Sequence, residues 1–366
     1  MKIRIFISIL VLSYLLSSCN RSEKEILVKM ERIKEIGDIN APYALMMADS
    51  LDCMEENGSD YLKAKYALLQ IRLKDKNYDV ASSDLKITKV VAFFKSNGTD
   101  RERQEAYYYA GSVYRDLKDT PRAISYFLKS VKEVSGSSDC DSVLLRNAYS
   151  NLNCLYYDVQ DFRNALGMAL KEFMIAEQLH ILEPTNVMHV ANAYVALDSV
   201  RKAKDFYKLA VACLDKSEGT DDDVVNKLLL QVSSLKDEKY ADVIYKRFKS
   251  WKRTKYNSGY YLALAEYYLL KCEDDSAACS YKKVLEIADD DYAMYDASKS
   301  LFKLYSGNGQ LEEANNYAKM FIGLTEKIDL GRRQELAASV NNKFQYNVNK
   351  EKLAKIEQRE SMYKKL

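Results

Sequence analysis

The sequence predicts an all-α protein, an α-solenoid of antiparallel helix pairs that ends in a long C-terminal helix. Six times along the chain an alanine follows nine residues after a tyrosine or, once, a valine: Tyr114/Ala123, Tyr156/Ala165, Tyr194/Ala203, Val232/Ala241, Tyr268/Ala277 and Tyr305/Ala314. Successive pairs are 42, 38, 38, 36 and 37 residues apart, a regularity typical of helical repeats. Only 12 glycines and 3 prolines occur in 366 residues, which favours long helices with short connections.

Residues 1–18 predict a lipoprotein signal peptide. Lys2 and Arg4 precede a mostly apolar run over residues 5–16, which is too short for a comfortable membrane span. The following Leu-Ser-Ser-Cys sequence, which ends at Cys19, resembles the lipobox of bacterial lipoproteins. This resemblance implies cleavage before Cys19, lipidation of that residue, and an exported protein anchored in a membrane and facing the periplasm or the cell exterior. The alternative is an ordinary signal peptide with a chance cysteine at its end.

The charge of the mature chain argues against nucleic-acid binding. Without the two basic residues of the signal, 53 basic and 53 acidic residues remain from Cys19 onward, so the net charge is zero. The sequence has no excess of basic residues that could bind phosphate groups, and we expect no nucleic-acid partner. The acidic runs 221–223 and 289–291 stand where helices are expected to start, and we interpret them as helix caps.

Residues 19–103 are expected to form capping helices and a degenerate repeat. Amphipathic helices are predicted near 22–36 and 41–56, because terminal parts of a repeat array differ from its interior. The segment 60–95 is interpreted as a degenerate repeat, aligned on Tyr78 and Ala81.

Six repeats are predicted over residues 104–323, starting at Gln104, Arg146, Pro184, Asp222, Ser258 and Tyr295. They resemble tetratricopeptide repeats (TPRs), which have a small eighth residue, a tyrosine at position eleven and an alanine at position twenty. The first repeat matches with Gly111, Tyr114 and Ala123, whereas the fourth has the large Leu229 at the eighth position. The small residues are expected to let the paired helices approach closely, and the tyrosines to fill the space between neighbouring repeats.

Residues 324–366 predict one long, highly charged helix. Tyr346, Leu353, Ile356 and Tyr363 give a weak heptad pattern, so a solvated helix and a homodimer seam are both open.

No catalytic or metal-binding motif is present, and we expect no enzyme activity and no cofactor. The sequence has no GxSxG elbow, no phosphate-binding glycine loop and no HExxH. The two histidines, His180 and His189, are not spaced to share a helix face. Six cysteines besides Cys19 lack a recognisable disulfide framework, and free thiols are favoured over bridges, with Cys272/Cys279 the best candidate for a bond.

The TPR resemblance also implies a binding face. In that family the first helix of each pair lines a concave surface, chiefly through its second, fifth, ninth and twelfth positions. Carried onto this chain, these positions offer Tyr108, Ser112, Arg115, Asn147, Ser150, Tyr157, Met188 and Asn192. Aromatic, amide and arginine groups of this kind suit an extended peptide or a partner's helix.

The whole mature chain resembles the exported TPR proteins common in Bacteroidetes, particularly over residues 74–78 and 107–117. This resemblance implies a lipid-anchored, non-enzymatic scaffold of the cell envelope that binds another protein or a peptide. One alternative is a sensory ectodomain, or its shortened remnant, of a transmembrane regulator that pairs through the C-terminal helix. Another is a glycan-binding lipoprotein of a nutrient-uptake system, which the single tryptophan, Trp251, supports less well.

Overall fold

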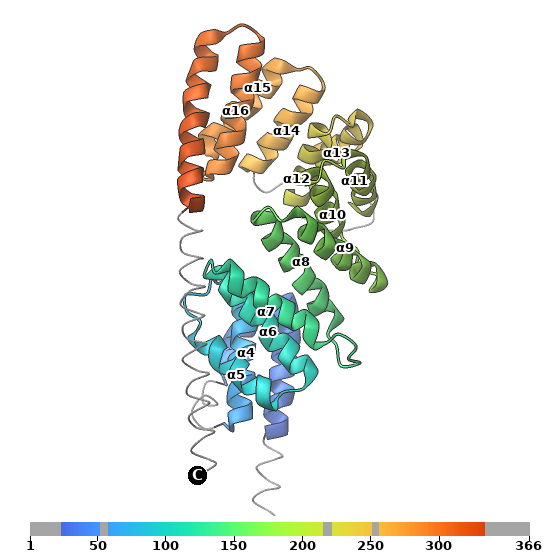
Figure 1. Cartoon of the computed structure of the whole chain (residues 1–366), viewed down its shortest axis with the longest axis vertical. Helices are drawn as coiled ribbons and strands as arrows, with labels where there is room; N and C mark the ends of the chain where they lie inside the picture. Colours follow the sequence, from blue (N-terminus) through green and yellow to red (C-terminus); the bar gives the residue numbers. More distant parts are fainter. Residues whose placement is uncertain (1–22, 52–57, 215–221, 251–255, 334–366) are drawn as a thin grey trace, which may run out of the picture. The chain divides into compact units, whose positions relative to one another are not determined.

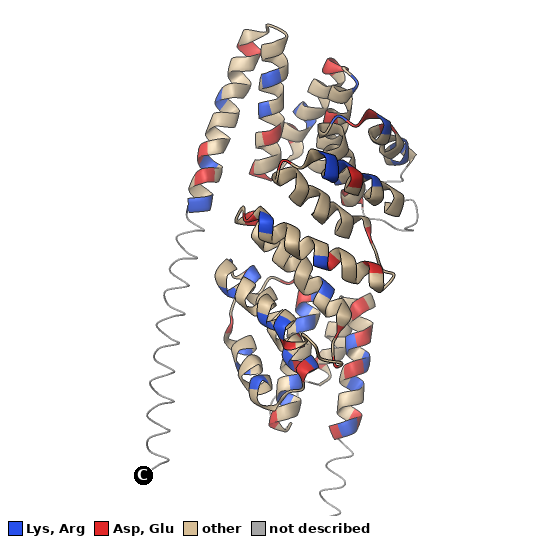
Figure 2. Cartoon of the chain, turned by 45° about the vertical axis from the view of Figure 1, so that its right-hand side comes forward, with Lys and Arg blue, Asp and Glu red and all other residues tan. Residues whose placement is uncertain are grey.

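The computed structural model describes residues 23–51, 58–214, 222–250 and 256–333, which form helices and no strand (Figure 1). The all-α prediction is therefore confirmed. The chain divides into two compact units, Met1–Ala148 and Tyr149–Leu366, with the division inside one helix, α8 (Ser142–Asp158). Basic and acidic residues are interspersed along the helices (Figure 2).

In the first unit, a helix over residues 23–39 precedes α2 (Ala41–Asp49), α4 (Asp60–Lys76), α5 (Leu85–Asn97), α6 (Asp100–Asp116), α7 (Thr120–Glu133) and the start of α8. In the second unit, the rest of α8 precedes α9 (Phe162–Gln178), α10 (Pro184–Ala196), α11 (Val200–Leu214), α12 (Asp222–Ser234), α13 (Glu238–Ser250), α14 (Ser258–Leu270), α15 (Asp274–Ile287), α16 (Asp291–Gly307) and a helix over residues 311–333.

Side chains that accept hydrogen bonds from backbone N–H groups fix many of the helix starts. Thr99 and Glu102 form a capping box at the start of α6. Asp119 accepts from the N–H of Arg122 at 3.1 Å and so caps α7. Asp290 caps α16, so this part of the acidic run 289–291 has the role expected from the sequence.

One turn geometry recurs in all six of the Tyr/Val–Ala pairs, each of which spans two described helices. The residue four positions after the tyrosine or valine has a positive φ, between 54° and 74°: Lys118, Gln160, Asp198, Lys236, Cys272 and Gly309. The N–H of the next residue donates to the carbonyl of the tyrosine or valine at 2.8 to 3.3 Å. This is the bond of a Schellman motif, which ends the first helix and immediately starts the second.

The alanines of these pairs lie where two helices approach closely. Five of them, at positions 123, 165, 203, 241 and 277, have no exposed surface, and Ala314 is 3% exposed. Gly111 contributes to the same close packing, because a Cβ atom there would lie 2.7 Å from the Phe127 ring. Leu229, the large residue at the small position of the fourth repeat, is fully buried beside Ala241, so the core accommodates it.

The sequence analysis expected the tyrosines of the pairs to fill the space between neighbouring repeats, and Tyr268 does pack against two successive core clusters, whereas Tyr114 and Tyr305 stack within their own hairpins. Tyr114 stacks on Tyr126 of the same hairpin, with ring centroids 5.3 Å apart. Arg122 covers the Tyr114 ring at 4.2 Å. Tyr305 stacks in the same way on Tyr317, at 5.6 Å. An aromatic ring one turn beyond the alanine offers the nearest flat surface, and the hairpin itself therefore takes up these side chains.

A buried arginine connects the N-terminal helices to the first repeat. Arg72 of α4 donates to both carboxylate oxygens of Asp38, at 2.7 and 2.9 Å, and to Glu105 of α6 at 3.3 Å. Lys34 also donates to Glu105, at 3.1 Å. Because a bidentate arginine pair is directional, this network sets how α4 lies against α6 and the helix over residues 23–39.

The helix over residues 311–333 runs through the boundary that the sequence analysis placed between residues 323 and 324. The last repeat and the beginning of the predicted C-terminal helix are thus one continuous helix, and residues 334–366 lie outside the described part of the chain. None of the described helices has the length and apolar composition that crossing a membrane requires.

We predict that Gly111→Ala lowers the stability of the protein by about 1–3 kcal/mol, because the new methyl group overlaps the Phe127 ring. The matched control is Gly167→Ala in the interior of α9, where nothing lies within 4 Å of the new Cβ. Removing a helical glycine there should stabilise by about 0.5–1 kcal/mol. Urea unfolding of both variants checks the difference, and equal effects would contradict the close packing at Gly111.

Candidate functional site

The connection between α4 and α5 departs from the other hairpin turns. Helix α4 ends in the same geometry, with Tyr78 at φ 61° and the N–H of Asp79 donating to the Lys74 carbonyl at 3.0 Å. In the regular turns the next helix is capped by the residue that follows the positive-φ position. Here the N-cap of α5 is Asp84, so residues 79–83 are additional.

This insertion overturns the alignment of the degenerate repeat. Tyr78 is 93% exposed rather than buried, and Ala81 lies in the connection rather than in a helix. The residue equivalent to Tyr114 is Lys74, and the core of this hairpin consists of other residues: Leu62, Leu69 and Leu73 of α4, and Ile87, Val90 and Phe94 of α5.

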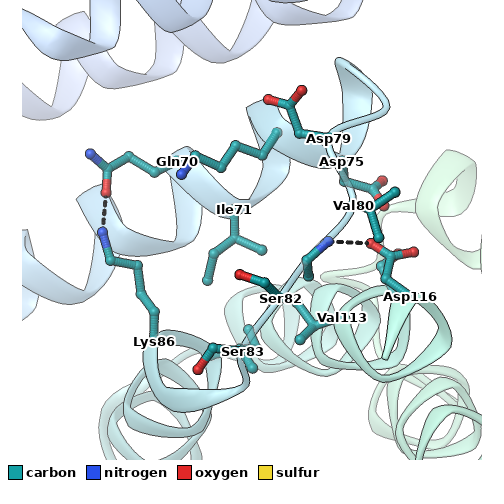
Figure 3. A pocket seen from close by; sticks show the side chains of 14 residues that line it. Gln70, Ile71, Asp75, Asp79, Val80, Ser82, Ser83, Lys86, Val113 and Asp116 are labelled. Carbon is teal, nitrogen blue, oxygen red and sulfur yellow. Dashed lines mark hydrogen bonds between the residues drawn. The ribbon is translucent and has the colours of Figure 1, made fainter. Parts of the chain in front are cut away.

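The added residues line a pocket of about 400 Å³ together with α4, the start of α5 and the end of α6 (Figure 3). The whole insertion, residues 79–83, contributes to the wall. The volume falls in the range of small-ligand sites, roughly 300–1,000 Å³. The pocket therefore exists because the chain inserts residues into an otherwise regular turn.

Three side chains of the first repeat hold the inserted loop. The N–H of Ala81 donates to Asp116 at 3.2 Å. Asp84 accepts from the hydroxyl of Tyr114 at 3.0 Å and from Arg122 at 3.3 Å. Since Ala81 in the middle of the insertion and Asp84 directly after it are attached to α6 and α7, the pocket wall is a built part of the fold.

The polar groups of the pocket are separated by charge. Asp75, Asp79 and Asp116 lie at one end, and Lys86 lies with Gln70 at the other, where its Nζ donates to the amide oxygen at 2.5 Å (Figure 3). Ile71 and Val113 lie between the two ends (Figure 3).

Ser112 also lines this pocket and is buried. Its hydroxyl has no hydrogen-bond partner among the described residues. A buried hydroxyl without a partner is costly, and the oxygen of this one has no surface open to the pocket.

Three residues predicted for an accessible concave face are buried: Tyr108, Ser112 and Met188. The prediction of a surface contact is wrong for Tyr108 and Met188. Tyr108 packs on the rings of Tyr109 and Phe127, with centroids 5.0 and 5.4 Å away, and Met188 belongs to the core of the second unit. Neighbouring first helices pack against each other, α4 on α6 and α12 on α14, and cover side chains that the family pattern leaves open.

The other predicted residues are at least partly exposed. Arg115 pairs with Asp75 at 3.1 Å and with Asp116 at 3.0 Å, so it adjoins the pocket. Asn147 belongs to the first unit, and Ser150, Tyr157 and Asn192 belong to the second. Asn192 accepts a hydrogen bond from the hydroxyl of Tyr207. A concave face that unites these residues stays a prediction. The predicted lipidation site, Cys19, lies outside the described residues.

The insertion at residues 79–83 was missed by sequence reasoning, although a signal for it exists. No alanine lies nine residues after Lys74, and a run of small residues, Ala81-Ser82-Ser83, separates the two helical stretches. The Tyr–Ala spacing does not identify this repeat, because Lys74 stands where the other repeats have a tyrosine. The left-handed turn still forms, since it depends on backbone geometry and not on the tyrosine side chain.

Comparison with known proteins identifies the fold. No protein-family model and no curated protein matches the sequence. The apo form of RapI is similar in structure, with a TM-score of 0.63 and 14% identity over 83% of this chain and 86% of that chain. The apo quorum sensor NprR from B. thuringiensis has a TM-score of 0.53 and 14% identity over 83% of this chain and 99% of that chain. NprR in complex with its cognate peptide NprX has a TM-score of 0.52 and 14% identity, covering 82% and 99%.

The chain has a TPR-like fold. At this level of sequence identity the likeness concerns the arrangement of helices alone.

A second polar cluster lies in the interior of the TPR-like second unit. Glu172 of α9 is buried and accepts from Asn186 at 2.7 Å. It also pairs with Nδ1 of His189 at 2.9 Å. Burial lowers the pKa of His189, but hydrogen bonds with Cys154 and Glu172 and the charge of Glu172 outweigh it and raise this pKa to about 10. His189 is therefore a structural cation that joins α10 to α9.

Among the described cysteines, Cys140, Cys154, Cys272 and Cys279 are free thiols. Cys272 and Cys279 are both exposed and form no bond with each other. Cys213 packs against the core of the second unit as a small apolar residue.

We predict opposite effects for two serine substitutions in the first unit. Ser112→Ala should raise the free energy of unfolding by about 1 kcal/mol, because it removes a buried hydroxyl that has no partner. Ser130→Ala should lower it by a similar amount of about 1 kcal/mol, because its hydroxyl donates to the Gln104 carbonyl at 2.9 Å. Thermal unfolding measures both, and equal destabilisation would show that the Ser112 hydroxyl is satisfied.

We predict that Glu172→Gln destabilises the protein most at low pH. Because the pKa of His189 is about 10 in the folded protein and ordinarily 6.5, the stabilising charge is fully present below pH 6.5 and is lost as the pH rises to about 10. At pH 6 we expect a loss of about 3 kcal/mol, which shrinks towards pH 10.

Urea unfolding at pH 6, 8 and 10 measures this dependence. The matched control is Asp205→Asn, which removes an exposed partner of Lys208 and should change stability by less than about 1 kcal/mol at each pH. A loss for Glu172→Gln that is the same at every pH would show that His189 carries no charge in the folded protein.

Proposed function

We propose that the protein is a non-enzymatic, lipid-anchored scaffold of the cell envelope that binds another protein. The observation that carries the proposal is the exposed apolar surface of the α4–α5 connection. Tyr78, Val80 and Leu85 are 93%, 76% and 73% exposed, and they lie within eight residues on a loop that is fastened to the first repeat. Large apolar side chains gathered in this way are typical of protein–protein contacts.

The TPR-like fold supports this proposal. Its helix hairpins present side chains at regular intervals on a packed scaffold, an arrangement suited to extended binding surfaces. One solved structure of similar fold is a Rap protein complexed with competence and sporulation factor, with a TM-score of 0.51 and 13% identity over 84% of this chain and 99% of that chain. Of the predicted concave-face residues, we propose Arg115 as a partner contact of the first unit, and Tyr157 and Asn192 as partner contacts of the second unit.

The lipid anchor rests on the sequence. The Leu-Ser-Ser-Cys motif ending at Cys19 follows a basic and apolar signal, and it accounts for export and membrane attachment together. Several acyl chains on one residue attach a protein stably, since each buried methylene contributes about 0.8 kcal/mol.

A second candidate function is a sensory ectodomain that pairs through the C-terminal helix. The uninterrupted helix over residues 311–333 favours it, because a helix without a break can transmit a movement of the repeats to the segment that follows. Self-association of the full chain that is lost on deleting residues 334–366 would support this function over a scaffold of single copies.

We predict that Cys19→Ser abolishes lipid attachment. Metabolic labelling with an alkyne fatty acid should mark the wild-type protein and not the variant, and the variant should leave the membrane fraction. Cys272→Ser, which removes an exposed thiol, is the control and should stay labelled. Equal labelling of Cys19→Ser and wild type would exclude the lipoprotein assignment.

We predict that the double substitution Tyr78→Asn and Leu85→Ser removes the partner. Asparagine tolerates the positive φ at position 78, and both side chains are exposed, so stability should change by less than about 0.5 kcal/mol. Cross-linking in the producing cells, capture through an internal tag and mass spectrometry should show at least one protein several-fold depleted. The control Met174→Ser changes another exposed apolar residue, which is 55% exposed and lies on α9. An unchanged set of cross-linked proteins in the double variant would refute a contact at this loop.

A further inference from the structure

The pocket under the inserted loop has a negative and a positive pole. Asp75 lies near the C-terminal end of α4 and Asp116 at that of α6, so the partial negative charges of two helix ends add to their carboxylates. Asp79 of the insertion lies at the same end (Figure 3). Arg115 already pairs with Asp75 and Asp116, but three carboxylates against one guanidinium leave this end negative, so it suits a cationic group such as an ammonium.

The opposite pole is built from the first turn of α5. Asp84 precedes this helix but makes no side-chain cap, because its carboxylate accepts from Tyr114 and Arg122 instead. The N–H of Leu85 donates to the hydroxyl of Ser83 at 3.3 Å, and the other N–H groups of the first turn contribute the partial positive charge of the helix start. Lys86 lies on the same turn. Lys86 is held by Gln70, which places its ammonium group at the pocket (Figure 3). This end suits a carboxylate.

The middle of the pocket is apolar. Ile71, Ile87 and Val113 contribute aliphatic surface. Ser112 also belongs to the pocket wall, but its hydroxyl oxygen is buried and does not face the open volume.

The charges of the pocket balance. The carboxylates of Asp75, Asp79 and Asp116 are matched by three cations, Lys74, Lys86 and the adjoining Arg115. A ligand with a net charge of either sign gains nothing from the site as a whole. A ligand that carries both charges at opposite ends, with an uncharged middle, matches the site.

We propose that this pocket binds a short free peptide as a zwitterion. Its N-terminal ammonium group contacts Asp75, Asp79 and Asp116, and its C-terminal carboxylate contacts Lys86 and the first turn of α5. The site goes beyond the protein-binding function proposed above, because an internal segment of a partner has neither charged end.

Binding of defined tripeptides to the full mature chain tests the proposal. The probes are a mixture of Ala-Xaa-Ala peptides with free ends, its N-acetylated form and its C-terminal amide, followed by saturation-transfer NMR and then calorimetry on the best binder. The free peptides should bind, and blocking either end should weaken binding about tenfold or more, as expected for the loss of one charged hydrogen-bonded contact. Equal binding of free and acetylated peptides, or no binding of free peptides at millimolar concentration, would overturn it.

Two substitutions test which pole of the pocket binds each end of the peptide. Asp79→Asn should weaken the free and the amidated peptide, while Lys86→Gln should weaken the free peptide and leave the amide unchanged. Lys89→Gln, an exposed change one turn further along α5, is the control and should bind like the wild type. Affinities that do not depend on these groups would place the peptide elsewhere and refute the proposed site.

Discussion

The close approach of two helices at a buried alanine is the constraint on which each repeat depends. Any larger side chain at Ala123 or its equivalents would separate the helices, and the Schellman turn that precedes it would then no longer bring the second helix back along the first. Five of the six turns place a residue other than glycine at a positive φ, as Lys118 does. The backbone hydrogen bonds and the packed alanine together therefore impose a conformation that the side chain alone disfavours.

Much of the fold could be predicted because this constraint leaves a mark in the sequence. An alanine that must be small, nine residues after a side chain that must fill a hairpin, recurs wherever the hairpin recurs. The prediction of the repeat alignment failed at the α4–α5 hairpin, which has the same turn without the tyrosine. Helix α4 ends in the same turn with Lys74 in place of tyrosine, and the alignment moved to Tyr78, which is exposed. Burial of Met188 was not predictable either, since it depends on which neighbouring helices pack together.

The pocket could not be predicted from the sequence for a related reason. Its parts come from the end of α4, an insertion, the start of α5 and the end of α6, and only the fold brings them together. The arrangement depends on groups outside it. Arg72 fixes α4 against α6 through Glu105, and Tyr114, a repeat tyrosine, also orients Asp84. One side chain thus serves the packing of a hairpin and the electrostatics of the site beside it.

The position of the insertion separates two kinds of evolutionary change. The residues that hold the hairpins together lie in helices, whereas residues 79–83 lie in a connection that adds no core contact of its own. Related chains can therefore exchange the length and chemistry of this loop while the helices that carry it stay intact. Divergence in ligand preference should then be concentrated in a few consecutive positions, and the other hairpin turns, which share the same backbone geometry, are points where comparable loops can arise.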